Sequence, residues 1–178
     1  SNWPKLGPLM GTLEKARAEG LDFRCDRYPY IAGATGLSTL FPIWAREGGT
    51  EGFLARLKDP AFDARIRAHL AEQEKGYGSW DRILISDVVS DKNRAIEGMN
   101  VLEAAAGSGK APYEFMRDLI IEESDRVGMV SFYGSEDVLK RILAHPLVGV
   151  GADASAVAPY GPLGKGKPHP RTYGTFPR

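Results

Sequence analysis

Asp153 is the residue of this sequence whose setting most suggests chemistry. It lies in the stretch VGVGADAS (148–155), where Val148 and Val150 predict a buried strand. A carboxylate at the end of so apolar a run costs on the order of several kcal/mol unless a charged or hydrogen-bonding group meets it. An aspartate can instead cap a helix, but the residues after Asp153 predict a loop. Since no helix follows to be capped, a chemical role for Asp153 is favoured.

A basic loop after Asp153 offers a second chemical group. The segment GPLGKGKPHPR (161–171) is rich in Gly and Pro, which predicts a loop with a partly fixed backbone. Its basic side chains form either an ordinary solvated surface or an anion clamp; they are Lys165, Lys167, His169 and Arg171. In a clamp, Arg171 would give two parallel hydrogen bonds to a carboxylate or a phosphate.

The other candidate motifs favour structural roles. GSGK at 107–110 is similar to a phosphate-binding loop, but that pattern needs a glycine where Ala104 stands. We therefore interpret it as a linker between helices. Cys25 is at an inward-facing position of an alternating strand, which favours a packed thiol over a nucleophile. The histidines belong to unrelated segments and lack the spacing of a metal site; they are His69, His145 and His169.

The expected order of helices and strands, which must position these residues, indicates an α/β fold. Helices are expected from residue 9 to Gly20, from Asp59 to Gly76, from Asn100 to the GSGK break, from Pro112 onward, and from Ser135 to His145. Strands are expected at 21–28, 80–89, 128–134 and from Val148, and the apolar stretch at 33–44 is expected to be a loop. Strands separated by helices favour parallel pairing, and such sheets bind ligands at the carboxyl ends of their strands. Tyr28 and Asp153 both lie just past such ends.

Composition excludes several classes of protein. The 178 residues are enough for one domain with a substantial core. Lys plus Arg equals Asp plus Glu, 23 each, so no overall charge attracts nucleic acid or an anionic membrane. The single cysteine excludes a disulfide framework. No apolar run approaches the roughly 20 residues of a membrane span, and no signal-peptide pattern opens the sequence. We expect a soluble, cytoplasmic protein.

Three long segments resemble one known family. They are EKARAEGLDFRCDRYPYIAGATGLSTLFPIWAREGG, WDRILIS and EDVLKRILAHPLVGVGADASAVAPYGPLGKGKPHPRTYGTFPR. Together, the blocks YPY-AG, VG-D-S and HPR-YGTFPR are similar to the later part of the N-acyl-D-amino-acid deacylases, or D-aminoacylases, of the amidohydrolase superfamily. The resemblance implies a (β/α)8 barrel that hydrolyses the amide of an N-acyl-D-amino acid with zinc.

The resemblance implies roles for individual residues. Asp153 matches the aspartate that takes a proton from zinc-bound water and passes it to the leaving amine, which suits a carboxylate beside a metal-bound water. Arg171 matches the arginine that holds the α-carboxylate of the substrate, and Tyr28 the tyrosine whose hydroxyl joins it. A serine that often helps is replaced by Ala34, with Thr35 beside it.

The family's zinc ligands, histidines and a cysteine, lie on earlier barrel strands. The resemblance therefore implies that zinc is held outside this chain, and Cys25 does not match the ligand cysteine. We expect residues 1–178 to be a single α/β domain, a fragment comprising the last strands and helices of the barrel, with both ends unfinished. In isolation we expect it to be inactive, and either to self-associate through open strand edges or to form an open α/β sheet.

Two alternatives stay open on the sequence: a non-catalytic α/β binding module and a hydantoinase-like hydrolase of cyclic amides. The expected partner is a small-molecule substrate, an N-acyl-D-amino acid. The stretch LSTLFPIW (37–44) offers apolar walls, which favours neutral or apolar D-amino acids. Arg46 is near enough in sequence to keep an acidic side chain possible.

Overall fold

A computed structural model describes residues 2–176, so the last two residues of the YGTFPR block lie outside the described part. The described residues divide into two compact units. Unit 1 comprises residues 2–32, 133–158 and 170–176, and unit 2 comprises residues 33–132 and 159–169. The expectation of one domain stays a prediction. Within residues 2–176, no helix combines the length and the apolar character needed to cross a membrane.

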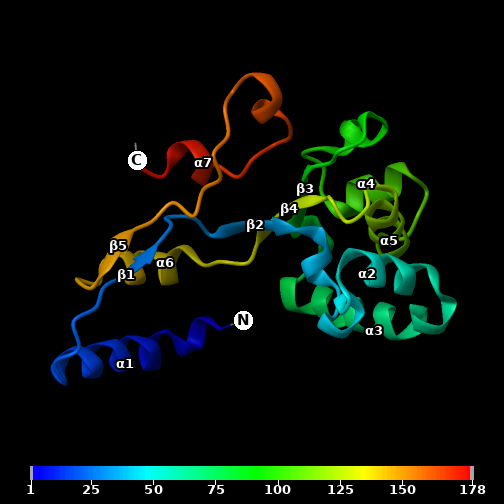
Figure 1. Cartoon of the computed structure of the whole chain (residues 1–178). Coiled ribbons are helices and arrows are strands. Elements are labelled where there is room, and N and C mark those ends of the chain that lie inside the picture. Colours follow the sequence, from blue (N-terminus) through cyan, green and yellow to red (C-terminus); the bar gives the residue numbers. More distant parts are fainter. Residues whose placement is uncertain (1, 177–178) are drawn as a thin grey trace. The chain divides into compact units, whose positions relative to one another are not determined.

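Unit 1 is built around two short parallel strands. Its helices and strands are α1 (Leu6–Ala18), β1 (Cys25–Arg27), α6 (Glu136–Leu143), β5 (Val148–Val150) and α7 (Arg171–Gly174). β1 pairs with β5 in parallel, with Cys25 opposite Val148 (Figure 1). The predicted cap of α6 is present, because the Ser135 hydroxyl oxygen accepts a hydrogen bond from the Val138 N–H at 3.5 Å. Parallel pairing of the strands around Tyr28 and Asp153 is thus confirmed.

β5 differs from the buried strand that its sequence predicts. Val150 is 50% exposed and Gly149 is exposed as well. Among the described residues β5 pairs only with β1, and a strand at the edge of a two-stranded sheet is not covered on both faces. The alternation of Val and Gly therefore does not mark a core strand here.

Unit 2 joins a small sheet to a group of helices. Its elements are β2 (Ala32–Gly36, which begins at the last residue of a unit 1 segment), α2 (Gly49–Lys58), α3 (Pro60–Tyr77), β3 (Ile83–Asp87), α4 (Val101–Gly107), α5 (Pro112–Glu122) and β4 (Gly128–Phe132). The strand order is β2-β4-β3. The predicted helix starts are correct: Asp59 Oδ1 accepts from the Ala61 N–H at 2.9 Å, and Asn100 forms a capping box with Glu103.

The predicted parallel pairing is wrong for β3 and β4. These strands are antiparallel, with Ile83 opposite Ser131 and Ile85 opposite Met129. A parallel crossover returns the chain through one connecting helix, whereas two helices, α4 and α5, connect β3 to β4. The rule that predicts parallel strands therefore does not apply to this connection.

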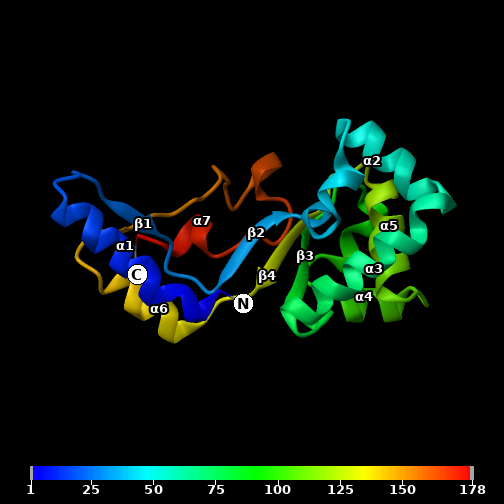
Figure 2. The ribbon, with the colours of Figure 1, turned by 90° about the horizontal axis from the view of Figure 1, so that it is seen from below.

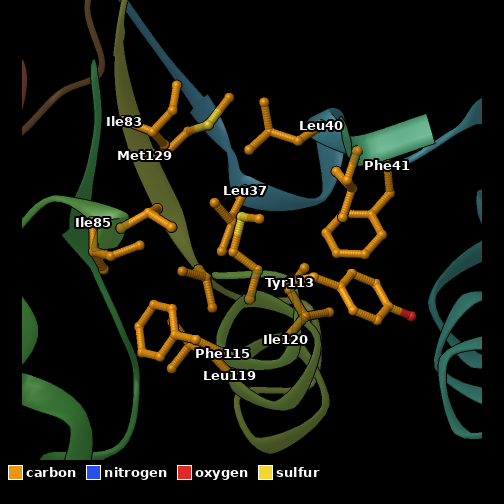
Figure 3. Packing of buried hydrophobic residues seen from close by; sticks show 14 of the residues in the cluster. Leu37, Leu40, Phe41, Ile83, Ile85, Tyr113, Phe115, Leu119, Ile120 and Met129 are labelled. Carbon is orange, nitrogen blue, oxygen red and sulfur yellow. The ribbon is translucent and has the colours of Figure 1, made fainter. Parts of the chain in front are cut away.

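The prediction of an apolar loop at 33–44 is also wrong. It overlaps β2 and two short 3-10 helices, Leu37–Leu40 and Ile43–Arg46. Leu37, Leu40 and Phe41 are at most 1% exposed and lie inside unit 2 (Figure 3). The sequence suggested that these three side chains form the walls of a substrate pocket. They fill the core of unit 2 instead.

The core of unit 2 lies between α5, the strands and the turns after β2. Helix α5 contributes Phe115, Met116, Leu119 and Ile120, as its apolar spacing predicts. They meet Ile83, Ile85 and Met129 of the sheet (Figure 3). The helices α2, α3, α4 and α5 gather against one another around this core (Figure 2). GSGK joins α4 to α5, as predicted.

A buried carboxylate, that of Glu123, lies beside the core of unit 2. Glu123 is 2% exposed and accepts hydrogen bonds from the N–H groups of Val89 and Ser90 at 2.8 and 2.9 Å. It also accepts from the Ser90 hydroxyl and from Asn93 Nδ2. Burial alone would raise the pKa of Glu123, but the hydrogen bonds from Ser90, Asn93 and Val89 together lower it to about 2. Through these hydrogen bonds, Glu123, which directly follows α5, fixes the position of the segment that follows β3.

Glu123→Gln should lower the free energy of unfolding by about 2 kcal/mol at neutral pH, because an amide cannot accept all of these bonds. The depressed pKa means that the contribution of Glu123 is complete above the pKa of an unfolded glutamate, about 4.3, and is lost as the pH falls through about 2. Urea denaturation should therefore show the gap between wild type and variant closing over that interval.

The neighbouring Glu122→Gln is the matched control. Glu122 is 41% exposed at the side chain and pairs with Lys92 at 2.9 Å. An ion pair of this exposure contributes less than about 1 kcal/mol. Equal losses for the two variants would show that Glu123 acts as a surface charge and not as a buried anchor.

Candidate functional site

Unit 1 brings together the three side chains singled out from the sequence: Tyr28, Asp153 and Arg171. Asp153 Oδ2 accepts a hydrogen bond from Arg171 Nη1 at 2.7 Å. The guanidinium carbon of Arg171 lies 5.4 Å from the centre of the Tyr28 ring. Residues far apart in the chain thus form one cluster, which we call the Tyr28–Asp153–Arg171 cluster.

The strands and a helix end position this cluster. Tyr28 follows β1 directly, and Asp153 follows β5 by three residues. Because β1 and β5 are parallel, their carboxyl ends meet at the same edge. The ladder continues past the strands, since the Gly151 N–H donates to the Arg27 carbonyl at 3.1 Å. Arg171 is the first residue of α7.

The backbone turns sharply at Asp153. Its φ is +48°, in the left-handed region, where aspartate is one of the few tolerated residues other than glycine. Before the turn, a side chain at position 151 would clash with Asp26, because an added Cβ would come within 2.3 Å of Asp26 Oδ2. The left-handed φ of Asp153 therefore ends the extended path of the backbone that β5 begins.

Burial differs between the two charged partners. The Asp153 side chain is 69% exposed, whereas the Arg171 side chain is 12% exposed. An ion pair with so exposed a carboxylate contributes about 1 kcal/mol or less to stability. The pair therefore adds little to folding, and Asp153 stays accessible to water and small molecules.

A pair of tyrosine hydroxyls extends the cluster. Tyr28 Oη lies 2.8 Å from Tyr133 Oη, and the Arg27 guanidinium carbon lies 4.2 Å from the centre of the Tyr28 ring. Partial burial, followed by the hydrogen bond with Tyr28, raises the pKa of Tyr133. Sequence reasoning missed both Arg27 and Tyr133. The signal for Tyr133 was present, since it directly follows β4 as Tyr28 follows β1.

Several sequence candidates lie elsewhere. Ala34 and Thr35 belong to β2 in unit 2. Arg46 is also in unit 2, and its Nε is buried without a hydrogen-bond partner among residues 2–176. Cys25 is a half-buried free thiol in β1. His145 Nε2 lies 3.5 Å from Glu14 Oε1, at the end of α6.

The described residues offer no metal centre of their own. Between residues 2 and 176, no three His, Cys, Asp or Glu side chains gather closely enough to hold a metal ion. Asp153, the acidic residue of the cluster, instead faces the guanidinium of Arg171. What the cluster can do without further residues is bind an anion through Arg171 and accept a proton at Asp153.

No family model and no curated protein matches the chain. Solved structures do match nearly all of it. The N-acyl-D-glutamate deacylase of Bordetella bronchiseptica, complexed with zinc and a phosphonate inhibitor, aligns over 99% of this chain with 23% identity and a TM-score of 0.61. A D-aminoacylase that defines a novel subset of amidohydrolases aligns over 99% with 25% identity and a TM-score of 0.56. Another D-aminoacylase structure, concerned with a binuclear metal centre, aligns over 98% with 25% identity and a TM-score of 0.56.

The chain spans about a quarter of the length of these solved structures, 26–27%. An α/β fragment of an amidohydrolase barrel, as expected from the sequence, accounts for that coverage. The predicted resemblance is therefore confirmed at the level of the fold: over nearly its whole length, the chain is similar to a fragment of a D-aminoacylase of the amidohydrolase superfamily.

Proposed function

We propose that this chain is part of a zinc-dependent hydrolase that cleaves the amide of N-acyl-D-amino acids. The observation that carries the proposal is the Tyr28–Asp153–Arg171 cluster, in which a proton acceptor and an anion clamp lie within one hydrogen bond of each other. Its support is the fold, which is similar to a quarter of a D-aminoacylase. The substrate would carry one carboxylate and one amide close together, as the cluster requires.

Asp153 would move the proton in this reaction. Amide hydrolysis needs a base that takes a proton from water and an acid that returns it to the leaving nitrogen. A carboxylate that is 69% exposed at the end of a bent loop can reach a bound water and a substrate nitrogen.

Arg171 would hold the α-carboxylate of the substrate. Its guanidinium already donates to a carboxylate, that of Asp153, at 2.7 Å. Nearly nine-tenths of its side chain is buried, so its orientation is fixed by packing. Charge-assisted bonds from arginine to carboxylate are stronger than neutral ones and specify geometry. The Tyr28 hydroxyl would add a neutral donor beside it.

Zinc would be held by residues outside this chain. The relatives include an enzyme complexed with zinc and one with a binuclear metal centre. The described residues provide no group of three metal ligands, and the part that we propose for this chain is proton transfer and substrate binding. A zinc ion would supply an activated water.

The substrates that we propose are N-acyl-D-amino acids as a class. Of the apolar walls expected from residues 37–44, Leu37, Leu40 and Phe41 are core side chains, whereas Ile43 is 76% exposed. The match to an N-acyl-D-glutamate deacylase at 23% identity is a likeness of fold alone.

One observation favours the alternative of a non-catalytic binding module. Unit 2 contains a pocket of about 360 Å³, whose lining includes Ile96, Phe115 and Leu119 and the ion pair of Lys110 and Asp118. An apolar pocket with a few polar groups is a common ligand site. If the full-length protein binds small molecules but hydrolyses none, this alternative replaces the hydrolase.

Asp153→Asn in the full-length protein should lower kcat by about 10²- to 10⁴-fold, the usual contribution of a general acid–base group. Steady-state kinetics with N-acetyl-D-methionine would measure it. Asp22→Asn is the matched control, since Asp22 is 93% exposed in unit 1 and pairs with Arg17 as Asp153 pairs with Arg171. Full activity in a folded Asp153→Asn enzyme would end the catalytic role.

Arg171→Met should act mainly on kcat/KM, because a charged contact to the substrate carboxylate is lost. We expect a drop of about 10- to 100-fold, from the 1.5–3 kcal/mol typical of such bonds. The variant should also discriminate less between the acid and its neutral amide analogue. If thermal melts fall while kinetics and discrimination are unchanged, Arg171 is only a packing residue.

The 178-residue chain alone should show no deacylase activity, even with zinc added, because a catalytic zinc site needs about three protein ligands. Turnover of N-acetyl-D-methionine by the purified chain would contradict this.

Size-exclusion chromatography should show self-association through the exposed β1–β5 edges. In the full-length gene product, an HxH motif, two further histidines and a ligand cysteine should precede this chain, and their absence would refute the proposal.

A further inference from the structure

Helix α7, which carries Arg171, has little apolar packing of its own. Within the described part of the chain, α7 contributes no fully buried side chain. Tyr173 is 50% exposed, and Phe176, just past the helix, is 72% exposed. Thr175 is buried, but its hydroxyl donates to the Arg171 carbonyl at 2.9 Å, within the same turn of chain. Contacts other than an apolar core therefore fix the place of α7 and of the guanidinium that it carries.

Tyr30 supplies such a contact. Its hydroxyl donates to the Pro170 carbonyl, directly before α7, at 3.4 Å. On the helix itself, a Cβ added to Gly174 would lie 2.8 Å from the Tyr30 hydroxyl oxygen. Non-bonded heavy atoms prefer separations of about 3.5–4.0 Å, so the phenol lies against the helix only because residue 174 has no side chain. Arg171 and Gly174 are three residues apart, and they are therefore neighbours on the helix surface.

The backbone that carries Tyr30 is fixed at both sides of this residue. The Tyr30 N–H donates to the Tyr28 carbonyl at 2.9 Å, and Arg27 Nη2 donates to the Tyr30 carbonyl at 3.1 Å. The next residue, Ile31, accepts at its carbonyl from the Gly134 N–H at 2.7 Å. A Cβ on Gly134 would lie 2.6 Å from that carbonyl oxygen, so the two backbones approach closely. The Tyr30 ring can thus leave α7 only by changing its rotamer.

We propose that Tyr30 is a positioning residue for Arg171: its hydroxyl, packed against Gly174 and bonded to the Pro170 carbonyl, holds α7 where the guanidinium meets the carboxylate of the substrate. The proposal rests on the proposed deacylase function and adds to it the contact that sets the place of the anion clamp. Arg171 touches the substrate, and Tyr30 acts through Arg171. Neither Tyr30 nor Gly174 takes part in moving the proton of the reaction.

The test places a methyl group between the helix and the phenol in the full-length enzyme. Gly174→Ala suits a helical backbone, but it pushes α7 away from the Tyr30 oxygen. A misplacement of about 1 Å can cost about 10²-fold in rate, so we expect this smaller shift to lower kcat/KM for N-acetyl-D-methionine about three- to tenfold, mainly through KM. The kcat/KM for the neutral amide, N-acetyl-D-methioninamide, should not change, because it has no carboxylate for Arg171. Thermal melts show whether the variant folds.

Tyr30→Phe provides the rescue. Alone, it loses the bond to the Pro170 carbonyl and should raise KM for the acid about two- to threefold. Combined with Gly174→Ala, it removes the oxygen that the new methyl group would strike. The double variant should therefore return KM for the acid to the level of Tyr30→Phe alone, since the two residues are in contact and their effects do not add.

Gly11→Ala is the matched control, because Gly11 lies in α1 of the same unit and a Cβ added there has no atom within 4 Å. It should leave the kinetics of the acid and of the amide unchanged, and a loss equal to that of Gly174→Ala would contradict the proposal. Unchanged kinetics in a Gly174→Ala enzyme, equal losses on acid and amide, or additive effects of the Gly174 and Tyr30 variants would each overturn the role of Tyr30 alone.

Two further outcomes are distinguishable from these. If Gly174→Ala does not fold, Tyr30→Phe decides, and an unchanged KM for the acid in that variant would overturn the role of Tyr30. A wild-type enzyme that neither hydrolyses N-acetyl-D-methionine nor binds its D-methionine product by calorimetry would overturn the deacylase function, and the role of Tyr30 with it.

Discussion

The parallel pairing of β1 with β5 is the constraint on which the candidate site depends. Two strands that run in the same direction end at the same edge, so the residues that follow them meet. Tyr28 follows one strand and Asp153 the other, although they are far apart in the chain. Without that pairing, Arg171 would have no carboxylate beside it and no aromatic ring beneath it. The three residue pairs of the β1–β5 ladder therefore bring the side chains of the cluster together.

Local signals in the sequence predicted most of the helices, but α2 was missed, since its N-cap is Gly48 and no side chain caps it. Asp59, Asn100 and Ser135 each begin a helix with a side-chain cap, because capping needs only residues a few positions away. The pairing of strands depends on distant segments instead. The two-helix connection between β3 and β4 reverses the direction that a simple α/β rule predicts, and the apolar stretch after β2 could not be assigned to the core until its partners in α5 were known.

In the candidate site, too, local signals were predicted and contacts between distant segments were missed. Tyr28, Asp153 and Arg171 were predicted from strand ends and from resemblance, and they lie together. Tyr133 directly follows a strand, as Tyr28 does, but its contact with Tyr28 was missed because the two phenols are 105 residues apart in the chain. Arg27 was missed although it shares the inward-facing register of Cys25 in the predicted strand, because its contact with the Tyr28 ring is not visible in the sequence. Such residues become visible only when the backbone brings Gly134 against Ile31.

The contact between Asp153 and Arg171 has a consequence for how tightly any acid can bind. An incoming carboxylate does not fill an empty donor, because it exchanges with one already bound to Nη1. The free energy of that exchange is a difference between two similar ion pairs, and it is smaller than either pair alone. Neutral donors such as the Tyr28 hydroxyl do not take part in this exchange of charge. At a site of this kind, the carboxylate that already binds the arginine reduces the net attraction that the arginine exerts on an incoming acid.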